Sequence, residues 1–205
     1  MRGSVFEDRL RFAVSGFFTD TKDEQISDID FVTLTPFIVN VDTQTYGGEF
    51  EASYQLNDYF ALKGNVGLLQ SEVVNDQSGL REGFELPFAP NFTAGLSLLA
   101  EAPTERFGWQ TGGSVFAFAN YQHVGEQYTD TLETAQTPAY DLVDIRVGWR
   151  NERAEIYVFA ENLFDEDCEL NNFNAGVNVL TGEPANLVVP GPPRIVGIGA
   201  TIKLY

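Results

Sequence analysis

The sequence predicts an all-β protein, an antiparallel transmembrane β-barrel with about eight strands in this chain. Apolar and polar residues alternate within stretches of roughly ten residues, which is the pattern of a strand whose two faces meet different surroundings. The polar gaps between these stretches are alternately long and short. This order is typical of a membrane barrel, because loops grow on one side of the membrane and stay tight on the other.

Each expected strand ends where the alternation ends. We expect strands at about residues 10–21, 37–56, 59–72, 88–101, 109–123, 139–150, 154–164 and 194–205. No stretch approaches eighteen uninterrupted apolar residues, so the sequence contains no transmembrane helix. No Gly/Ser tract, proline run or charge block marks a linker, and residues 1–205 are therefore expected to form a single unit.

The alternation holds in three separate strands, which a helical period would not produce. The second strand places Gly48, Phe50, Ala52, Tyr54 and Leu56 opposite Glu49, Glu51, Ser53 and Gln55. The third places Phe60, Leu62, Val66 and Leu68 opposite Lys63, Asn65 and Ser71, and the sixth places Val143, Ile145, Val147 and Trp149 opposite Asp144 and Arg146. The polar set of each strand is expected to face away from lipid.

The cost of burying charge in lipid assigns the faces. A Lys or Arg on the lipid side of a barrel costs roughly 2–4 kcal/mol at the bilayer midplane. We therefore expect a polar lumen face that includes Glu49, Glu51, Lys63, Asp144 and Arg146, with the acids as partners of the two cations. In the fifth strand, Phe116 and Phe118 fall in the polar phase and are expected to pack against something inside the barrel.

Aromatic residues gather at the strand ends, where the headgroup level of a membrane suits rings that are apolar at one end and wet at the other. They are Phe18, Tyr46, Tyr54, Phe60, Trp109, Tyr121, Tyr140 and Trp149. The short gaps at residues 57–58, 102–108 and 151–153 are expected to be periplasmic turns. The long gaps that follow Thr21, Glu72, His123 and Phe164 are expected to be extracellular loops.

The charge excludes some functions. The net charge is −18, and the acids concentrate in residues 20–30, 76–85 and 165–169 within the long gaps. Nucleic acid is not expected as a partner, because phosphates require Lys and Arg. The acidic runs are interpreted as solvated surface, with a cation-binding rim as the alternative. Cys168 is the single cysteine and forms no intramolecular disulfide.

Candidate sites are few. Tyr121, His123 and Tyr128 are expected ligand contacts at the barrel mouth, and His123 is the only histidine. A zinc site would need more His or Cys ligands near it. Asp23, Glu24, Asp28 and Asp30 carry oxygen ligands suited to calcium, but their spacing lacks a glycine-centred loop. We expect no catalytic residue, cofactor or metal, and the chain is not expected to be an enzyme.

Several segments resemble one known family. Three segments are similar to the C-terminal barrel of TonB-dependent outer-membrane receptors: residues 138–149, residues 158–165 with an Asn-Leu-Phe-Asp strand end, and residues 190–198, which begin with Pro-Gly-Pro-Pro-Arg. Further matches lie at residues 47–51, 86–90 and 121–128. Their joint order runs through almost the whole chain.

The resemblance implies a 22-stranded barrel with an N-terminal plug, of which this chain is the C-terminal portion without the plug or the TonB box. Such receptors import ferric siderophores, cobalamin or oligosaccharides across the outer membrane of Gram-negative bacteria. The implied partners are outer-membrane lipid, the barrel-assembly machinery, the missing plug and strands, and TonB through the plug only. Alone, the chain is not expected to transport its ligand.

Three features depart from the pattern of the family or of an exported protein. Tyr205 falls out of phase with the final apolar row, which runs from Val196 to Leu204, and Asp167-Cys168-Glu169 stands where an aromatic is usual. No apolar signal segment precedes the first strand, so the chain is expected to be a processed or truncated piece, or to begin with an expression leader.

Three alternatives remain open from the sequence. In the first, the eight strands form a small self-closed barrel with an anchoring or structural role, whose interior would be filled by side chains. In the second, the protein is an outer-membrane hydrolase that uses His123. In the third, it is a soluble β-sandwich that binds a partner.

Overall fold

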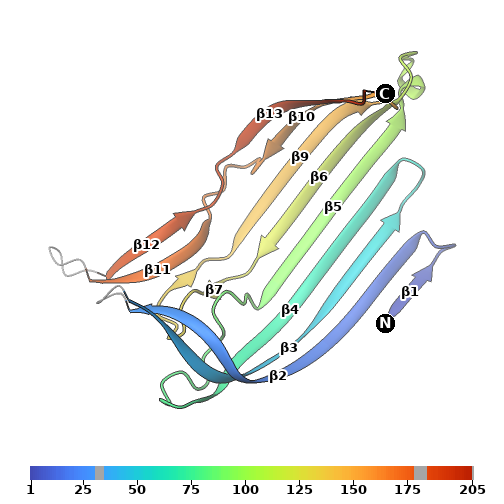
Figure 1. The fold of residues 1–205 in the computed structure, drawn as a ribbon. Coiled ribbons are helices and arrows are strands. Elements are labelled where there is room, and N and C mark those ends of the chain that lie inside the picture. Colours follow the sequence, from blue (N-terminus) through green and yellow to red (C-terminus); the bar gives the residue numbers. More distant parts are fainter. Residues whose placement is uncertain (31–34, 178–183, 205) are drawn as a thin grey trace.

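The computed structural model describes residues 1–30, 35–177 and 184–204. Within them the chain forms one nine-stranded antiparallel sheet in the order β1-β2-β3-β4-β5-β6-β9-β10-β13 (Figure 1). The strands are β1 (Arg2–Val5), β2 (Leu10–Asp30), β3 (Thr35–Gln55), β4 (Phe60–Asp76), β5 (Phe92–Pro103), β6 (Ser114–Val124), β9 (Tyr140–Arg150), β10 (Ala154–Glu161) and β13 (Ile195–Ile202).

Two small hairpins lie between these strands. β7 (Gln127–Tyr128) pairs with β8 (Gln136–Thr137), and β11 (Glu169–Val177) pairs with β12 (Pro184–Pro190). The only helical turn in the described part of the chain is η1 (Thr104–Phe107), a 3-10 turn between β5 and β6. Gly108 ends it in the left-handed region with φ 77°, a conformation that glycine adopts without a Cβ clash. No described helix is long and apolar enough to cross a membrane.

The register keeps residues of one kind on one side of the sheet. Val14 lies opposite Phe50, Phe50 opposite Val66, and Val66 opposite Ala94. Directly opposed residues point to the same side, so the alternation of each strand adds to that of its neighbour. We call this side the apolar face and the other side the polar face. On β2 up to Thr21, on β3 from Thr43, and on β4, β5, β10 and β13, the even-numbered residues lie on the apolar face. On β6 and β9, the odd-numbered residues lie on it.

A ring packed across a glycine joins the last two strands on the polar face. Phe159 on β10 lies directly opposite Gly197 on β13. A Cβ at Gly197 would lie 2.7 Å from the Phe159 ring, so the ring fits there only because glycine has no side chain.

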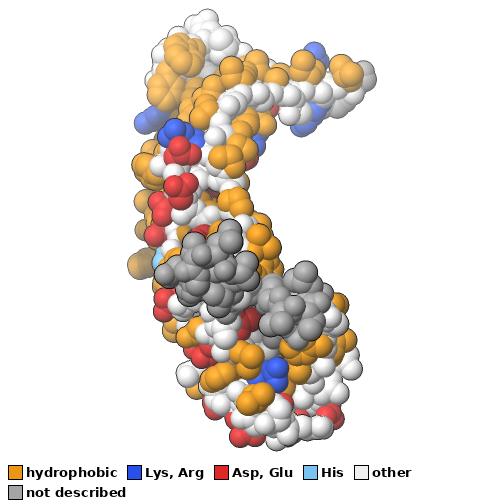
Figure 2. Space-filling model, turned by 90° about the vertical axis from the view of Figure 1, so that its left-hand side faces the viewer, with side chains coloured by type: hydrophobic (Ala, Val, Ile, Leu, Met, Phe, Trp, Pro, Cys, Tyr) orange, Lys and Arg blue, Asp and Glu red, His pale blue; other side chains and the backbone are white. Residues whose placement is uncertain are grey.

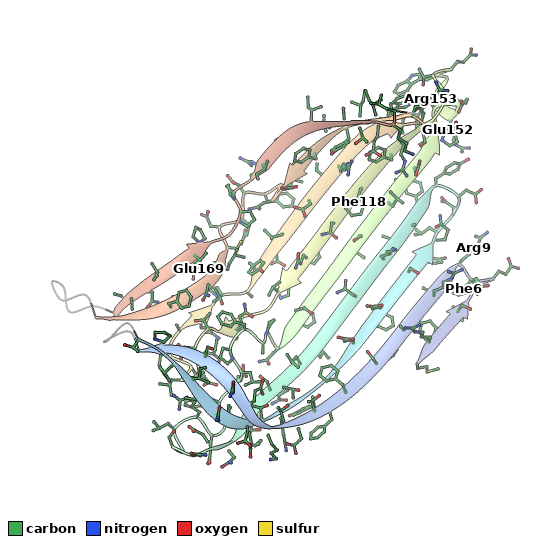
Figure 3. The ribbon with its side chains drawn as sticks, in the orientation of Figure 1. Phe6, Arg9, Phe118, Glu152, Arg153 and Glu169 are labelled. Carbon is green, nitrogen blue, oxygen red and sulfur yellow. The ribbon has the colours of Figure 1, made fainter. Side chains whose placement is uncertain are left out.

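The two ends of the sheet differ as the gap lengths predict. Tight turns join β1 to β2, β3 to β4 and β9 to β10 at one end, which we call the short-turn end. Figure 3 shows Arg9, Glu152 and Arg153 together at this end, and Glu169 on β11 toward the opposite end. That opposite end, which we call the long-loop end, carries residues 77–91, 125–139, 162–177 and 184–194 and the outer described part of the β2–β3 hairpin.

The sheet is a curved layer with little protein interior. Figure 2 shows it hollowed on one side. Only six hydrophobic residues of the described chain are buried, whereas most large side chains of the apolar face are exposed, among them Leu68 at 57% and Ile198 at 78%. Soluble monomers rarely expose an apolar surface that runs across so many strands, so the apolar face needs another apolar phase to cover it.

The eight predicted strands and their antiparallel order are confirmed, and the short edge strand β1 adds to them. The prediction that a loop begins after Thr21 is wrong. β2 continues to Asp30 and β3 begins at Thr35, because the two strands keep pairing beyond a register shift between Thr21 and Glu24. The intrinsic propensity of these acidic residues favours a loop, but cross-strand pairing keeps them in the two strands of a hairpin.

Three further expectations can be compared with the structure. In the described residues β1 pairs only with β2 and β13 only with β10, so the sheet is open and the self-closed barrel is not observed. Tyr205, whose phase departs from the family pattern, lies outside the described residues. The long gap after Phe164 is not structureless, since it contains the β11–β12 hairpin.

Candidate functional site

The polar face is the first candidate surface, because it gathers more charged side chains than the apolar face. Glu49 and Glu51 on β3, Lys63 on β4, and Asp144 and Arg146 on β9 all lie on it. The register places them there because each stands one residue away from an apolar position of its strand. That this face lines a barrel lumen belongs to the proposal made below.

The expected ion pairs between these five residues do not form. Glu49 accepts a hydrogen bond from the Ser15 hydroxyl at 3.1 Å, and Asp144 accepts one from the Asn162 backbone N–H at 3.0 Å. Arg146 pairs with Glu155 on the next strand instead. The prediction failed because it matched charges across the sequence, whereas the register sets which strands are neighbours.

A cluster of arginines and aromatic rings covers the polar face near the short-turn end. The Arg146 guanidinium lies 3.4 Å from the centroid of the Tyr157 ring, and Arg150 lies 5.1 Å from that of Phe116. Arg150 also donates from Nε to Glu101 at 2.9 Å. Guanidinium groups stack on aromatic faces while their edges pair with carboxylates, so the cluster holds the side chains of β5, β6, β9 and β10 together.

Phe116 and Phe118 lie on the polar face, as their phase predicts. Phe116 is 5% exposed and its ring lies beneath the two arginines. Phe118 is 37% exposed and extends from the middle of β6 (Figure 3). Of the two rings, only Phe118 therefore remains open to a contact on the polar face. That contact with something inside the barrel stays a prediction.

The loop that follows β10 is built around one buried asparagine. Asn162 is 2% exposed and adopts φ 47°. Its Nδ2 donates to the Glu166 and Pro192 carbonyls at 2.9 and 3.0 Å, and its Oδ1 accepts the Glu166 backbone N–H at 2.8 Å. Asparagine tolerates the left-handed region and bonds to nearby backbone, which explains its place in this turn.

An acidic residue of the same turn fixes the entry to the last strand. Asp165 accepts the Arg194 backbone N–H at 3.1 Å and lies 3.4 Å from the Arg194 guanidinium. Together with the Asn162 bond to Pro192, these contacts join the end of β10 to the start of β13. The Asn-Leu-Phe-Asp and Pro-Gly-Pro-Pro-Arg stretches are thus two halves of one junction at the long-loop end.

The structure separates the three expected ligand contacts. Tyr121 and His123 lie on β6 in the phase of the apolar face, where Asp141 accepts a hydrogen bond from the Tyr121 hydroxyl at 2.6 Å and lies 2.8 Å from His123 Nδ1. Phe92 packs against His123 with ring centroids 5.4 Å apart. Tyr128 lies apart from them on β7, and its carbonyl accepts the Phe88 N–H at 2.8 Å. Ligand contact at these residues stays a prediction.

A buried ion pair at the long-loop end holds a loop arginine that bonds to a second loop. Arg81 and Asp76 are each 7% exposed, and Arg81 Nη1 donates to Asp76 Oδ2 at 3.2 Å. Arg81 Nε also donates to the Thr131 hydroxyl at 3.0 Å, which links the loop of residues 77–91 to that of residues 125–139. A second link runs from the Glu85 N–H to the Glu133 carboxylate at 2.8 Å.

The β11–β12 hairpin joins the same loop assembly. The Thr129 hydroxyl donates to the Asn172 carbonyl, and Asn172 Nδ2 donates to the Gln136 carbonyl at 3.3 Å. Asp130 holds the loop between them, since its carboxylate accepts the N–H groups of Leu132 and Ala135 at 2.8 and 2.7 Å. Three segments far apart in the sequence therefore form one hydrogen-bonded layer.

This loop layer gives a prediction for pH. The Ser78 hydroxyl and the Arg81 guanidinium hold the pKa of Asp76 below its ordinary value of 3.8. Because the pKa is lower in the folded loop, the stabilising contribution is present above that value and is lost as pH falls through the lowered pKa. Hydrogen exchange of residues 77–91, corrected for the intrinsic rate, is expected to be unchanged from pH 7 to 5 and faster at pH 3.

The control is Asp76→Asn, which keeps the shape but removes the titrating group. It is expected to give fast exchange in this loop already at pH 6, with little further change at pH 3. A loss of protection in the wild-type loop between pH 7 and 5 would show that another group sets the pH dependence.

No group of three or more His, Cys, Asp or Glu side chains with metal-ligand geometry occurs among the described residues. Within the β2–β3 hairpin the Glu24 carboxylate accepts a hydrogen bond from the Thr43 hydroxyl, and the Asp23 backbone N–H donates to Asp42. The side chains of Asp28 and Asp30 lie outside the described part. Cys168 is buried beside Gly191, and burial raises the pKa of its thiol.

The comparison with protein families decides the identity of the fold. Residues 2–163 match the family model of the TonB dependent receptor-like β-barrel. The chain belongs to this family. The match covers β1 to the end of β10, which are eight of the nine strands of the large sheet.

Solved structures of receptors share the fold. The ferric yersiniabactin uptake receptor FyuA from Yersinia pestis matches with a TM-score of 0.80 and 23% identity over 100% of this chain and 29% of that chain. The siderophore receptor PiuA from Acinetobacter baumannii gives 0.69 and 16% over 97% and 26%, and the copper transporter OprC gives 0.69 and 20% over 94% and 28%. The chain thus spans less than a third of these receptors.

Sequence reasoning missed the functional geometry of the barrel wall in two places. The role of Asn162 and Asp165 as the β10–β13 junction was not predicted, although both lie in a segment that carries the family resemblance. The pairing of Arg150 with Glu101 was also missed, and no local signal marks it, because the two residues lie 49 positions apart.

Proposed function

We propose that this chain is part of the barrel of a TonB-dependent uptake receptor in the outer membrane of a Gram-negative bacterium. The observation that carries the proposal is the two-faced sheet, which fits a receptor wall along its full length. The apolar face then contacts lipid, and the polar face lines the lumen. β6 and β9 each have eleven residues, which matches the roughly 9–11 residues of a tilted strand that spans a bilayer.

The family supports a receptor and transporter rather than an enzyme. The ligand class proposed is a scarce nutrient complex, a ferric siderophore, cobalamin or an oligosaccharide, and the named siderophore receptors favour the first. A copper transporter of the same fold shows that the barrel alone does not set the ligand. The loop layer at the long-loop end and the upper polar face are the proposed contact surfaces.

The remaining partners belong to the complete receptor. A plug domain and further strands would close the barrel against the free edges of β1 and β13, because an open edge inside a membrane leaves backbone groups unpaired. TonB would act through that plug, and the barrel-assembly machinery would insert the strands. On this proposal the 205-residue chain does not transport by itself.

Location and topology are tested by cysteine labelling in intact cells that export the chain. Leu80→Cys lies in the 77–91 loop, and Glu152→Cys lies in the β9–β10 turn. A membrane-impermeant maleimide is expected to label Leu80→Cys from outside, and to label Glu152→Cys only after the outer membrane is permeabilised. Equal labelling of both sites in intact cells, or recovery of the chain in the soluble fraction, would refute the proposed location.

Uptake is tested with the complete protein that contains this chain. Cells that lack other receptors are given a radiolabelled ferric siderophore, cobalamin or an oligosaccharide, with and without TonB. Accumulation of one class is expected to require both TonB and the loop layer, and removal of residues 77–91 is expected to abolish it. Accumulation of no class, or accumulation that continues without TonB, would contradict the proposed function.

A further inference from the structure

One row of side chains on the polar face holds two cations that the chain itself does not neutralise. Arg11 on β2 lies directly opposite Ser53 on β3, Ser53 opposite Lys63 on β4, and Lys63 opposite Ser97 on β5. Neighbouring strands lie about 4.8 Å apart, so Arg11 and Lys63 flank Ser53 at about 10 Å from each other. The register therefore places two cations and two hydroxyls side by side.

Arg11 and Lys63 differ in their ion pairing from the two arginines of β9 on the same face. Arg146 and Arg150 on the same face are bound to Glu155 and Glu101. Arg11 and Lys63 are exposed, and within the residues that the structure describes no acid approaches either of them to form an ion pair.

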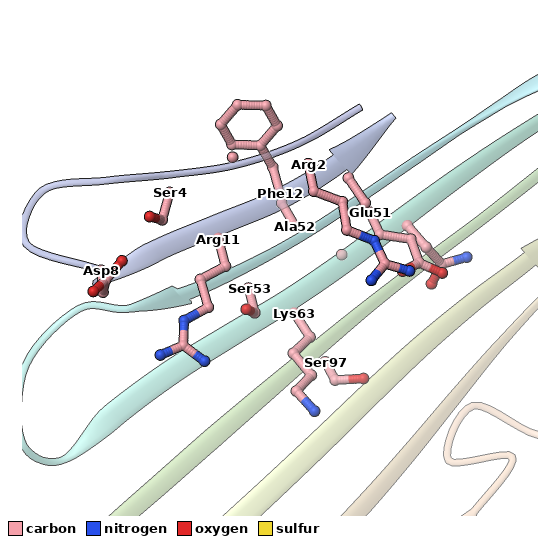
Figure 4. Close-up of a pocket in the computed structure, with 14 residues that line it drawn as sticks. Arg2, Ser4, Asp8, Arg11, Phe12, Glu51, Ala52, Ser53, Lys63 and Ser97 are labelled. Atoms are coloured by element: carbon pink, nitrogen blue, oxygen red, sulfur yellow. The ribbon is translucent and has the colours of Figure 1, made fainter. Parts of the chain in front are cut away.

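The row lies in a hollow large enough for a small anion. A cavity of about 840 Å³ is lined by Arg11, Ser53, Lys63 and Ser97 together with parts of β1, and the three cations of its lining, Arg2, Arg11 and Lys63, outnumber its two acids, Asp8 and Glu51. Figure 4 shows the Arg11 guanidinium and the Lys63 ammonium projecting on the same side of the sheet, with the Ser53 hydroxyl between their strands.

The donor set defines the chemistry of the ligand. The guanidinium, the ammonium and the Ser53 hydroxyl offer many hydrogen-bond donors and two positive charges, whereas the Ser97 hydroxyl already donates to Asn120 Oδ1 at 2.8 Å. Carboxylate and phosphate groups accept such bonds, and bonds between charged partners are about twice as strong as neutral ones. A neutral or cationic ligand would leave both positive charges without a partner.

We propose that Arg11, Ser53 and Lys63 form an oxyanion-binding site on the polar face near the short-turn end, which takes a carboxylate or phosphate group. The group has two sources: a free anion in the lumen, or an acidic side chain of a polypeptide segment that lies against this wall. The proposal concerns binding at this row only and does not depend on which nutrient is imported.

The test uses the 205-residue chain folded in detergent micelles and two probes. The first probe is inorganic phosphate, and the second is an end-capped tetraglutamate peptide, with tetraglutamine as its neutral control. Binding is measured by titration calorimetry at about 50 mM salt, because exposed charges are screened at higher ionic strength. Saturable binding of phosphate only assigns a free anion, and tighter binding of tetraglutamate assigns an acidic segment.

Matched variants separate the row from net charge. Arg11→Gln and Lys63→Gln are each expected to weaken binding of the preferred probe about tenfold, the effect of losing one charge-assisted hydrogen bond. Arg153→Gln, in the exposed β9–β10 turn at the same end of the sheet, removes the same charge and is expected to change affinity less than about twofold. Far-UV circular dichroism confirms that each variant is folded.

Two results would overturn the site. One is the absence of saturable binding of either probe by the folded chain. The other is an equal loss of affinity in Arg153→Gln and in the two row variants, which would mean that bulk charge attracts the anion. Neither result depends on uptake or on TonB, so a failure here is distinct from a failure of the proposed function.

Discussion

Asn162→Ala is expected to lower the free energy of unfolding by about 2–4 kcal/mol, because it leaves buried backbone groups of the junction without partners. The amide of Asn162 bonds to the carbonyls of Glu166 and Pro192 and to the Glu166 N–H, and it is 2% exposed, so water does not replace it. Alanine also adopts the observed φ of 47° less readily than asparagine. The measurement is equilibrium unfolding in urea of the chain reconstituted in lipid.

The matched control is Asn151→Ala in the β9–β10 turn. Asn151 Oδ1 also accepts two backbone N–H groups, from Arg153 and Ala154 at 2.8 Å each, but Asn151 is exposed and water is available to replace it. The expected loss there is about 1 kcal/mol or less. If both variants lose the same free energy, burial of the β10–β13 junction does not contribute as described.

Leu98→Arg and Leu99→Arg are expected to differ by about 2–4 kcal/mol in the free energy of unfolding in lipid vesicles, because only the first places a charge in hydrocarbon. The two leucines are adjacent on β5 and almost equally exposed, at 38% and 37%. Leu98 lies on the apolar face opposite Leu62, whereas Leu99 lies on the polar face opposite Ala61. The measurement is urea unfolding of the refolded chain in phosphatidylcholine vesicles.

The two variants add the same charge to the same strand, so each is the control for the other. Leu99→Arg is expected to change stability by less than about 1 kcal/mol, because a side chain on the water-filled side keeps its hydration. The same difference should vanish in a soluble sandwich, where either face packs against protein or meets water. Equal destabilisation by both substitutions would therefore contradict the membrane-spanning assignment.

The sequence predicted the faces of the strands correctly, but it did not predict which charged side chains are neighbours. Phe50, Val66 and Val147 were assigned to one face from the period of two alone, and the structure confirms it. The same reasoning placed Glu49 and Lys63 together on the other face, but it paired the charges wrongly. Pairing depends on register, and a shift of one residue in register changes every neighbour while it leaves the alternation of each strand intact.

The candidate site shows the same limit. Tyr121 and His123 were chosen as ligand contacts from their position near a strand end, yet they share the apolar face with a carboxylate that the sequence places 18 residues from His123. The oxyanion site was not predicted either, because Arg11, Ser53 and Lys63 come from three strands. Side chains that are distant along the chain become neighbours only when the strands pair.

The sequence by itself determined the class of fold, the number of main strands, their faces and the two kinds of ends, because these follow from local periodicity and from where turns interrupt it. Only the tertiary structure decided which charges remain without a partner, how the β10–β13 junction closes, and that the sheet stays open at β1 and β13. These depend on contacts between strands far apart in the chain, and such contacts are set by the register of the whole sheet.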